Sequence, residues 1–229
     1  MTGLFETMLA VDGRIVQLDE HVQRMARSCR ELGWEPLDED AFRSAANAIV
    51  QTEEHAVRVI YDHGALTAER FAIPHTTRSR RIHGRAVTLD PAFVRAPAQH
   101  KRVPEDLALR DLIPPDADEC LFVTGNGRIL EGTGTNVFAV RDDVLITAPD
   151  RVLPGIVRAW VLATAPTLGL RIEERAPAAS DVHRGAFFTG SLTTLAPIRV
   201  LNGRPCAAPG PAYEELREMF RRRVTLNPS

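Results

Sequence analysis

Lysine is almost absent from this chain of 229 residues: among its 28 lysine and arginine residues, only Lys101 is a lysine. Arginine can replace lysine on a solvated surface, but a guanidinium stays protonated and cannot act as an amine nucleophile. A lysine that survives among arginines is therefore a candidate for Schiff-base chemistry, in which a deprotonated amine attacks a carbonyl. The alternative is that one surface lysine has survived by chance, and the lysine count alone leaves both interpretations open.

Other features are scarce as well, and each scarcity excludes a class of protein. The formal net charge is −2, which gives no electrostatic case for binding nucleic acid or an anionic membrane surface. No segment reaches the length of a membrane span, and the first residues lack the basic stretch and apolar core of a secretory signal. Two short basic runs, 78–81 and 221–223, are interpreted as solvated faces or as part of a linker.

Cysteine is also rare. The three cysteines, Cys29, Cys120 and Cys206, are odd in number and widely spaced, and their spacing matches no metal site. Reduced thiols are the simplest interpretation, and they predict a cytoplasmic protein without a bound metal.

Hydrophobic residues make up 44% of the chain and charged residues 25%, which is typical of a soluble globular protein with one large domain or two small ones. Apolar periodicity and turn signals in the first third predict a small α+β unit. We expect a strand over 3–10, a hairpin turn at Asp12-Gly13, a helix from an Asp19 cap to Leu32, a helix over 38–51, and paired strands over 56–61 and 66–72.

The stretch 74–83 is polar, basic and without periodicity, which is typical of an inter-domain linker. It separates a small N-terminal domain, 1–73, from a larger C-terminal α/β domain, 84–229, which carries Lys101. Two α/β domains favour a ligand site in the cleft between them. In the second domain we expect strands over 85–89, 119–124, 129–131, 136–140, 144–148, 187–189 and 198–201, a helix over 155–168 that Pro166 can end early, and a helix over 213–224.

Six segments of the chain suggest its chemistry. In chain order they are Phe5-Glu6-Thr7, His21-Val22-Gln23-Arg24, His100-Lys101, Glu131-Gly132-Thr133-Gly134-Thr135-Asn136, Leu153-Pro154-Gly155-Ile156-Val157-Arg158, and Gly190-Ser191-Leu192-Thr193-Thr194 followed by Pro197. In this order and at these spacings they resemble the class IV, fold-type IV pyridoxal-phosphate enzymes. That family includes branched-chain and D-amino-acid aminotransferases and 4-amino-4-deoxychorismate lyase. The resemblance extends from Gly3 to about Arg204, and it implies a two-domain α/β (α+β) architecture with the cofactor, pyridoxal 5'-phosphate, in the cleft between the domains.

The resemblance implies roles for the residues around the reacting centre. Lys101 would form the Schiff base with pyridoxal phosphate and then move the α-proton, a task that needs a primary amine of lowered pKa. Glu131 matches the carboxylate that pairs with the pyridine nitrogen and keeps it protonated. Without Asn136 five positions later, this glutamate would be interpreted as an exposed residue before a glycine-rich turn. Leu153 matches an apolar residue that packs on the ring.

The implied phosphate site combines several kinds of donor. The start of the predicted helix offers the backbone N–H groups of Ile156 and Val157, where the helix dipole also favours an anion. Ser191 matches a hydroxyl donor. Arg24 matches an arginine that reaches the phosphate from the first domain, and only the His-x-x-Arg spacing distinguishes it from a surface arginine.

The implied substrate site is a turn. Leu192 and Thr193 match a turn whose backbone N–H groups hold the substrate carboxylate in aminotransferases of this family. Arg58 and Arg95 are guanidinium candidates for the same task, although such residues are more often partners in structural salt bridges.

Two departures from the family pattern leave the substrate open. Branched-chain aminotransferases carry a tyrosine five residues after the lysine, where this chain has Asp106. Lyases of the family often have an arginine where this chain has His63. The substrate and its stereochemistry therefore stay undetermined, while the implied cofactor site is intact.

The leading prediction is a pyridoxal-phosphate-dependent aminotransferase that acts on a small amino acid and a keto acid. The alternative is a lyase that releases pyruvate from aminodeoxychorismate, which the Phe5-Glu6-Thr7 segment and the compact length favour. A third possibility is a cofactor-binding protein without turnover, motivated by the lack of a segment that precedes Phe5 in longer relatives. We expect a homodimer, because relatives build their sites near a dimer interface.

Overall fold

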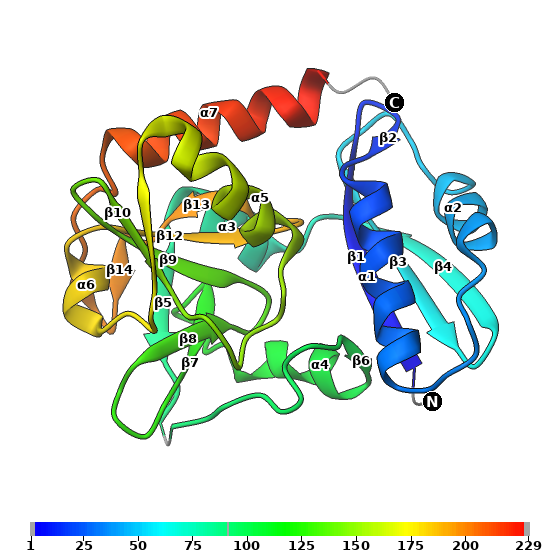
Figure 1. Ribbon diagram of the computed structural model, residues 1–229, viewed down its shortest axis with the longest axis horizontal. Coiled ribbons are helices and arrows are strands. Elements are labelled where there is room, and N and C mark those ends of the chain that lie inside the picture. The colour runs from blue at the N-terminus through cyan, green and yellow to red at the C-terminus, as the bar shows by residue number, and fades with distance from the viewer. Residues whose placement is uncertain (1–2, 91, 227–229) are drawn as a thin grey trace. The chain divides into compact units, whose positions relative to one another are not determined.

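A computed structural model describes residues 3–90 and 92–226 of the chain (Figure 1). The chain divides into two compact units. The expected ends of the two domains, at residues 1–2 and 227–229, lie outside the described residues. Unit 1 comprises Met1–Ile73, His100–Ala108 and Val224–Ser229, and unit 2 comprises Pro74–Gln99 and Leu109–Arg223.

Unit 1 is built on an antiparallel sheet with the strand order β2-β1-β3-β4. Asp12 and Gly13 have φ values of 52° and 77°, which is the conformation that a two-residue hairpin turn requires. A further short strand, β6, pairs with β1. This pairing groups Lys101 with unit 1, whereas the sequence predicts it in the larger domain. The strands are β1 (Gly3–Val11), β2 (Arg14–Ile15), β3 (His55–Asp62), β4 (Ala65–Phe71) and β6 (Arg102–Val103).

Two helices of unit 1, α1 (Leu18–Glu31) and α2 (Glu39–Asn47), pack on one face of this sheet (Figure 1). The shorter helix α4 (Glu105–Ala108) follows β6. Asp19 does not cap α1 as predicted: the N-cap is Gln17, with φ of 57°. The Asp19 carboxylate instead accepts a hydrogen bond from Arg43 of α2 at 2.9 Å. Asp38 does cap α2, because its carboxylate accepts from the N–H of Ala41 at 2.9 Å.

Unit 2 contains a mixed sheet with the order β11-β10-β9-β8-β7-β5-β14-β15. β12 pairs with β9 and with β13. The pairs β10–β11, β5–β7 and β5–β14 are parallel, and the other pairs are antiparallel. The strands are β5 (Arg85–Thr88), β7 (Glu119–Val123), β8 (Ile129–Gly132), β9 (Asn136–Arg141), β10 (Val144–Thr147), β11 (Arg171–Glu174), β12 (Ala186–Gly190), β13 (Thr194–Pro197), β14 (Val200–Leu201) and β15 (Arg204–Pro205).

The helix predicted over 155–168 has two parts. It is α-helical in α5 (Ile156–Thr164) and continues as the 3-10 turn η2 (Ala165–Leu168). Pro166 lacks an N–H and clashes with the preceding turn, so it ends the α-helical pattern as expected. The other helical segments are η1 (Leu109–Leu112), α6 (Ala179–His183) and α7 (Pro211–Leu226).

The segment expected to be an irregular linker is a helix, α3 (His75–Ile82). It belongs to unit 2, where it packs against β13. Arg80 of this helix is only 5% exposed, whereas Arg78 is exposed, so the basic run 78–81 is a solvated face only in part. The guanidinium of Arg80 finds acceptors on segments distant in sequence, which composition alone cannot show. Among the described residues, no helix is both long and apolar enough to cross a membrane.

Candidate active site

The residues that the sequence singles out are distributed over both units. Lys101, Arg24 and Arg58 belong to unit 1, and the remaining candidates belong to unit 2. Glu131 lies on β8, Leu153 precedes α5, Ile156 and Val157 form its first turn, and Ser191, Leu192 and Thr193 lie between β12 and β13.

Lys101 is half-buried and is fixed through its backbone. Its carbonyl accepts a hydrogen bond from the N–H of Phe5 at 3.0 Å. Its Nζ lies 4.5 Å from the centroid of the Phe5 ring, a distance at which a cation is attracted by the face of the ring. Lys101 and Arg24 line the same narrow pocket of unit 1, together with Glu6 and Ser28. The structure therefore brings Lys101 and Arg24 together.

Arg24 is held by a carboxylate that the sequence interpretation assigned no role. Its Nε and Nη2 donate to the two carboxylate oxygens of Glu6 at 2.7 and 2.5 Å. His21 contacts the same carboxylate through Nδ1 at 2.7 Å. All three residues are buried. This bidentate geometry fixes the plane of the guanidinium, so Arg24 is oriented before any ligand binds.

Opposing effects set the ionisation of this cluster. Burial by itself raises the pKa of Glu6, but Arg24 and His21 overcome this effect and lower the pKa well below its ordinary value. Burial lowers the pKa of His21; Glu6 opposes that shift, and the charges of Arg24 and Lys101 add to it. A lowered pKa leaves the imidazole neutral near pH 7, and the neutral ring can still donate from Nδ1 to Glu6.

Neighbouring residues also hold the segment that carries Lys101. Asp106 is the first of the two expected departures from the family pattern, and its carboxylate accepts from the N–H of Arg102 at 2.6 Å. His100 contacts the hydroxyl of Ser28 on α1 through Nδ1 at 3.0 Å. The second departure, His63, lies in the turn between β3 and β4. Asp106 and His100 therefore restrict the backbone on both sides of the lysine.

Glu131 is buried on β8, and its carboxylate orientation is fixed from two sides. One oxygen, Oε2, accepts from the N–H of Leu153 at 2.8 Å and from Nδ2 of Asn136 at 3.2 Å. The other oxygen, Oε1, lies 2.8 Å from Nη2 of Arg95. Leu153, expected only as an apolar contact, thus also contributes its N–H. Arg95, considered as a substrate-carboxylate candidate, is an ion-pair partner of Glu131.

The N-terminus of α5 is the candidate phosphate site. Its N-cap is Gly155, and no side chain caps it. The N–H groups of the first turn, at Ile156 and Val157, are therefore available in the manner typical of anion sites. A Cβ at Gly155 would lie 2.1 Å from Oδ1 of Asn136. Glycine is required here because Asn136, which also contacts Glu131, approaches the backbone closely.

The turn between β12 and β13 contains Ser191, Leu192 and Thr193. Thr194, at its end, has φ of 60°, a conformation that β-branched residues rarely adopt. Two arginines of α3 contact the turn: Arg80 donates to the Thr193 hydroxyl at 3.0 Å, and Arg81 donates to the carbonyl of Leu192 at 2.9 Å. External contacts thus hold this turn in a strained conformation.

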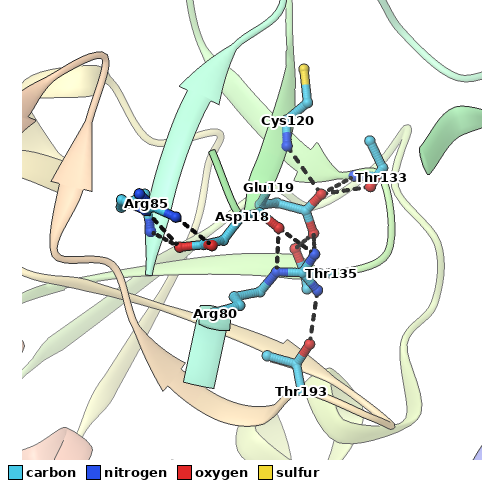
Figure 2. A network of polar contacts seen from close by, with 8 residues as sticks. All are labelled: Arg80, Arg85, Asp118, Glu119, Cys120, Thr133, Thr135 and Thr193. Carbon is cyan, nitrogen blue, oxygen red and sulfur yellow. Dashed lines mark hydrogen bonds and ion pairs between the residues drawn. The ribbon is translucent and has the colours of Figure 1, made fainter. Parts of the chain in front are cut away.

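A fully buried carboxylate, Glu119, lies next to Arg80, Thr133 and Thr135 (Figure 2). It accepts from the Thr133 hydroxyl at 2.6 Å and from the Thr135 hydroxyl at 2.8 Å. Nη2 of Arg80 lies 3.3 Å from its Oε2. A Cβ at Gly132 would lie 2.6 Å from the Glu119 carboxyl carbon, so this glycine lets the carboxylate reach the turn. The sequence interpretation missed both Arg80 and Glu119.

The sequence contains a signal for two of the residues that were missed, Glu119 and Glu6, but none for Arg80. Glu119 begins a strand that is otherwise apolar, and a charged residue at a buried strand position indicates an internal partner. Glu6 gives the same signal in β1. Arg80, by contrast, is one arginine of a basic run, and nothing local distinguishes it. Arg58, the other carboxylate candidate, pairs with Glu69 at 2.7 Å.

Comparisons with known proteins agree with these features. The family model described as amino-transferase class IV matches residues 3–201. A branched-chain-amino-acid aminotransferase of Pseudomonas aeruginosa is 31% identical over 56% of this chain, and the match spans 44% of that protein. A bifunctional aminodeoxychorismate lyase / D-amino acid transaminase of Mycobacterium tuberculosis is 28% identical over 88% of this chain and 82% of that protein.

Solved structures give the same result for the fold. A protein titled a hypothetical aminotransferase from Mycobacterium tuberculosis, in its PLP-bound form, has a TM-score of 0.82 and 26% identity, covering 97% of this chain and 88% of that one. A branched-chain aminotransferase from Thermoproteus uzoniensis, at 24% identity, has a TM-score of 0.80 over 97% of this chain and 85% of that one. The predicted resemblance and the predicted fold type IV are confirmed.

The donor groups described above fit pyridoxal phosphate, the cofactor of the family. A buried, oriented carboxylate at Glu131 suits a protonated pyridine nitrogen. The uncapped N-terminus of α5 suits a phosphate group. Lys101 supplies the primary amine that an aldehyde requires.

We predict that Glu6→Gln destabilises the protein by about 3–5 kcal/mol at pH 7, because it removes the carboxylate charge that pairs with the buried Arg24. The folded-state pKa of Glu6 lies below its ordinary value of 4.5. The stabilisation is therefore complete above that value and is lost as the pH falls below it. Urea unfolding measured between pH 7 and pH 3 should show a shallower acid slope for the variant than for the wild type.

Glu69→Gln is the matched control, because Glu69 also pairs with an arginine but its side chain is 53% exposed. An exposed pair contributes at most about 1 kcal/mol. Equal losses in the two variants would contradict the role assigned to Glu6.

Proposed function

Because this chain belongs to the class IV aminotransferase family, an enzyme family that uses pyridoxal phosphate, we propose that it transfers the amino group of a small amino acid to a keto acid through a Schiff base at Lys101. One observation carries the proposal: Lys101, the only lysine of the chain, lines the same narrow pocket of unit 1 as Arg24. When bound, the cofactor supplies an aldehyde and an electron-withdrawing ring.

Lys101 and Glu131 have the proposed catalytic roles. The Nζ of Lys101 takes the α-proton of the substrate and returns it later, which a primary amine of lowered pKa can do. The Glu131 carboxylate holds the proton on the pyridine nitrogen, so the ring keeps its capacity to withdraw electrons. The contacts of Glu131 with Leu153, Asn136 and Arg95 support this role, because they fix the carboxylate in one orientation.

The remaining candidate residues are proposed to bind the cofactor phosphate and the substrate carboxylate. The N–H groups of Ile156 and Val157, the hydroxyl of Ser191 and the guanidinium of Arg24 are proposed to bind the phosphate. Glu6 supports this role of Arg24, because it holds two N–H groups and so sets the direction of the others. The backbone of the turn at Leu192 and Thr193 is proposed to bind the substrate carboxylate.

A lyase reaction that releases pyruvate from aminodeoxychorismate is the second candidate. It is supported by the bifunctional lyase and D-amino acid transaminase that is 28% identical over 88% of this chain. The replacement of a family tyrosine by Asp106 is a further reason to keep it. We propose in addition that the enzyme works as a homodimer in the cytoplasm; the location rests on three cysteines that are free thiols.

The first prediction concerns the lysine. Borohydride reduction of the cofactor-loaded protein should place the pyridoxyl group on the peptide that contains Lys101. Lys101→Arg should remove both the label and the activity, because a guanidinium cannot form the Schiff base.

The double variant Lys101→Arg, Arg102→Lys is the matched control. It has the same composition and charge, but it moves the amine to position 102, the first residue of β6. Labelling and activity in this variant, or labelling of the wild type only at the N-terminal amine, would exclude the proposed role.

Another prediction concerns the carboxylate on β8. Glu131→Gln should leave the cofactor bound and lower kcat about a hundredfold, on the order of 3 kcal/mol of barrier, because an amide cannot hold the pyridine proton. Glu173→Gln, on an exposed strand, is the control. A kcat near the wild-type value for Glu131→Gln would show that the assignment is wrong.

The reaction class can be tested with the purified, loaded enzyme and a panel of L- and D-amino acids. A transaminase should release one keto acid per site from an amino donor alone and should then stop until an acceptor keto acid is added. Continuous release of pyruvate from aminodeoxychorismate without an acceptor, with no response to any amino acid, would favour the lyase instead.

A further inference from the structure

Helix α3 carries two arginines that contact the turn proposed to bind the substrate carboxylate. Arg80 and Arg81 are adjacent in sequence, yet they contact different parts of that turn. Arg80 donates to the Thr193 hydroxyl at 3.0 Å, and Arg81 donates to the Leu192 carbonyl at 2.9 Å. Both contacts span more than one hundred residues of sequence, and all of these residues lie in unit 2.

The contact of Arg81 determines the direction of a backbone donor. In a planar trans peptide, the carbonyl of one residue and the N–H of the next point in opposite directions. Arg81 holds the Leu192 carbonyl toward α3 through both Nε and Nη2. The N–H of Thr193 therefore points away from α3, where it can donate to a ligand.

The contact of Arg80 ties the same turn to the strand that carries Glu131. Its Nε and Nη2 also donate to the Asp118 carbonyl, at 3.0 and 2.6 Å. Nη2 lies 3.3 Å from Glu119, whose carboxylate holds the turn that follows Glu131 (Figure 2). One guanidinium with five donors in a rigid plane can satisfy this set, whereas a lysine ammonium cannot.

The turn between β12 and β13 also lies close to the turn between β8 and β9. A Cβ at Gly190 would lie 3.0 Å from the carbonyl oxygen of Gly134, so a small displacement of one turn meets the other. Thr194 adds a further constraint, because its positive φ has to be maintained by surrounding contacts. Arg80 and Arg81 are placed to provide them.

We infer that Arg80 and Arg81 are positioning residues for the carboxylate subsite: Arg81 orients the Thr193 N–H, and Arg80 fixes the turn against the Glu119 network and so against β8. This inference rests on the proposed function, because it needs a substrate carboxylate at that turn. It assigns a role in substrate affinity to a helix that the sequence presents as a linker.

The test measures binding of two carboxylates without an amino group, pyruvate and 4-methylpentanoate, to the cofactor-loaded protein through changes in its visible spectrum. Arg81→Met should raise both dissociation constants about tenfold, which corresponds to the loss of one hydrogen bond. Labelling of Lys101 by borohydride should stay at the wild-type level, and KM for the amino acid should rise with kcat nearly unchanged. Arg78→Met, at an exposed position of the same helix, is the matched control and should bind both probes as the wild type does.

Thr193→Val and Thr193→Ser keep the inference testable if an arginine variant does not fold. Valine removes the acceptor for Arg80 and should weaken both probes about tenfold, whereas serine keeps the hydroxyl and should bind within about twofold of the wild type. Unchanged dissociation constants in folded Arg81→Met would overturn this inference but not the proposed function. Equal weakening of probe binding in Arg78→Met would do the same. A wild-type protein that takes up no cofactor, or binds neither probe, would overturn the proposed function and the inference with it.

Discussion

A carboxylate in the interior of a protein has to find its countercharge and its hydrogen-bond donors there, because water does not reach it. Glu119 is such a carboxylate, and the local structure of unit 2 depends on how it is satisfied. Its donors come from β7, from the turn between β8 and β9, and from α3. A single side chain thereby holds three segments together, and two of them border residues with proposed roles. Apolar packing alone would fix the relative orientation of these three segments less strictly than this hydrogen-bonded network does.

Unit 1 follows the same rule with Glu6. The cost of burying its carboxylate is offset by a bidentate arginine and an imidazole, and the net effect on its pKa is downward. The arrangement serves Arg24 as much as Glu6, because the guanidinium loses its freedom to turn. The Nζ of Lys101 lies 4.5 Å from the ring centroid of Phe5, the residue next to Glu6. Side chains that alternate along β1 thus support both proposed functional residues of this unit.

The candidate site could be predicted from the sequence where local pattern and chemistry agree. Lys101 stands out because it is the only lysine, and the N-terminus of α5 because a glycine precedes an apolar helical run. The environment of Glu131 could not be predicted, since its contacts with Leu153 and Arg95 join residues 22 and 36 positions away. Leu153 donates through its backbone N–H, so the identity of its side chain does not predict this contact. Arg95 lies in a loop, and its local sequence does not predict which carboxylate it pairs with.

The sequence by itself determined the main strands and helices, the resemblance to class IV enzymes and the identity of the candidate lysine. These depend on periodicity, turn residues and the order of short segments, all of which are local or directly readable. Only the tertiary structure decided that Lys101 groups with unit 1 through β6, and that residues 75–82 form a helix with a buried arginine. Whether an arginine is solvated depends on acceptors such as Asp118 and Thr193, which lie 38 and 113 residues away. Burial and ion pairing are long-range properties, and the same short basic run is compatible with either outcome until the chain has folded.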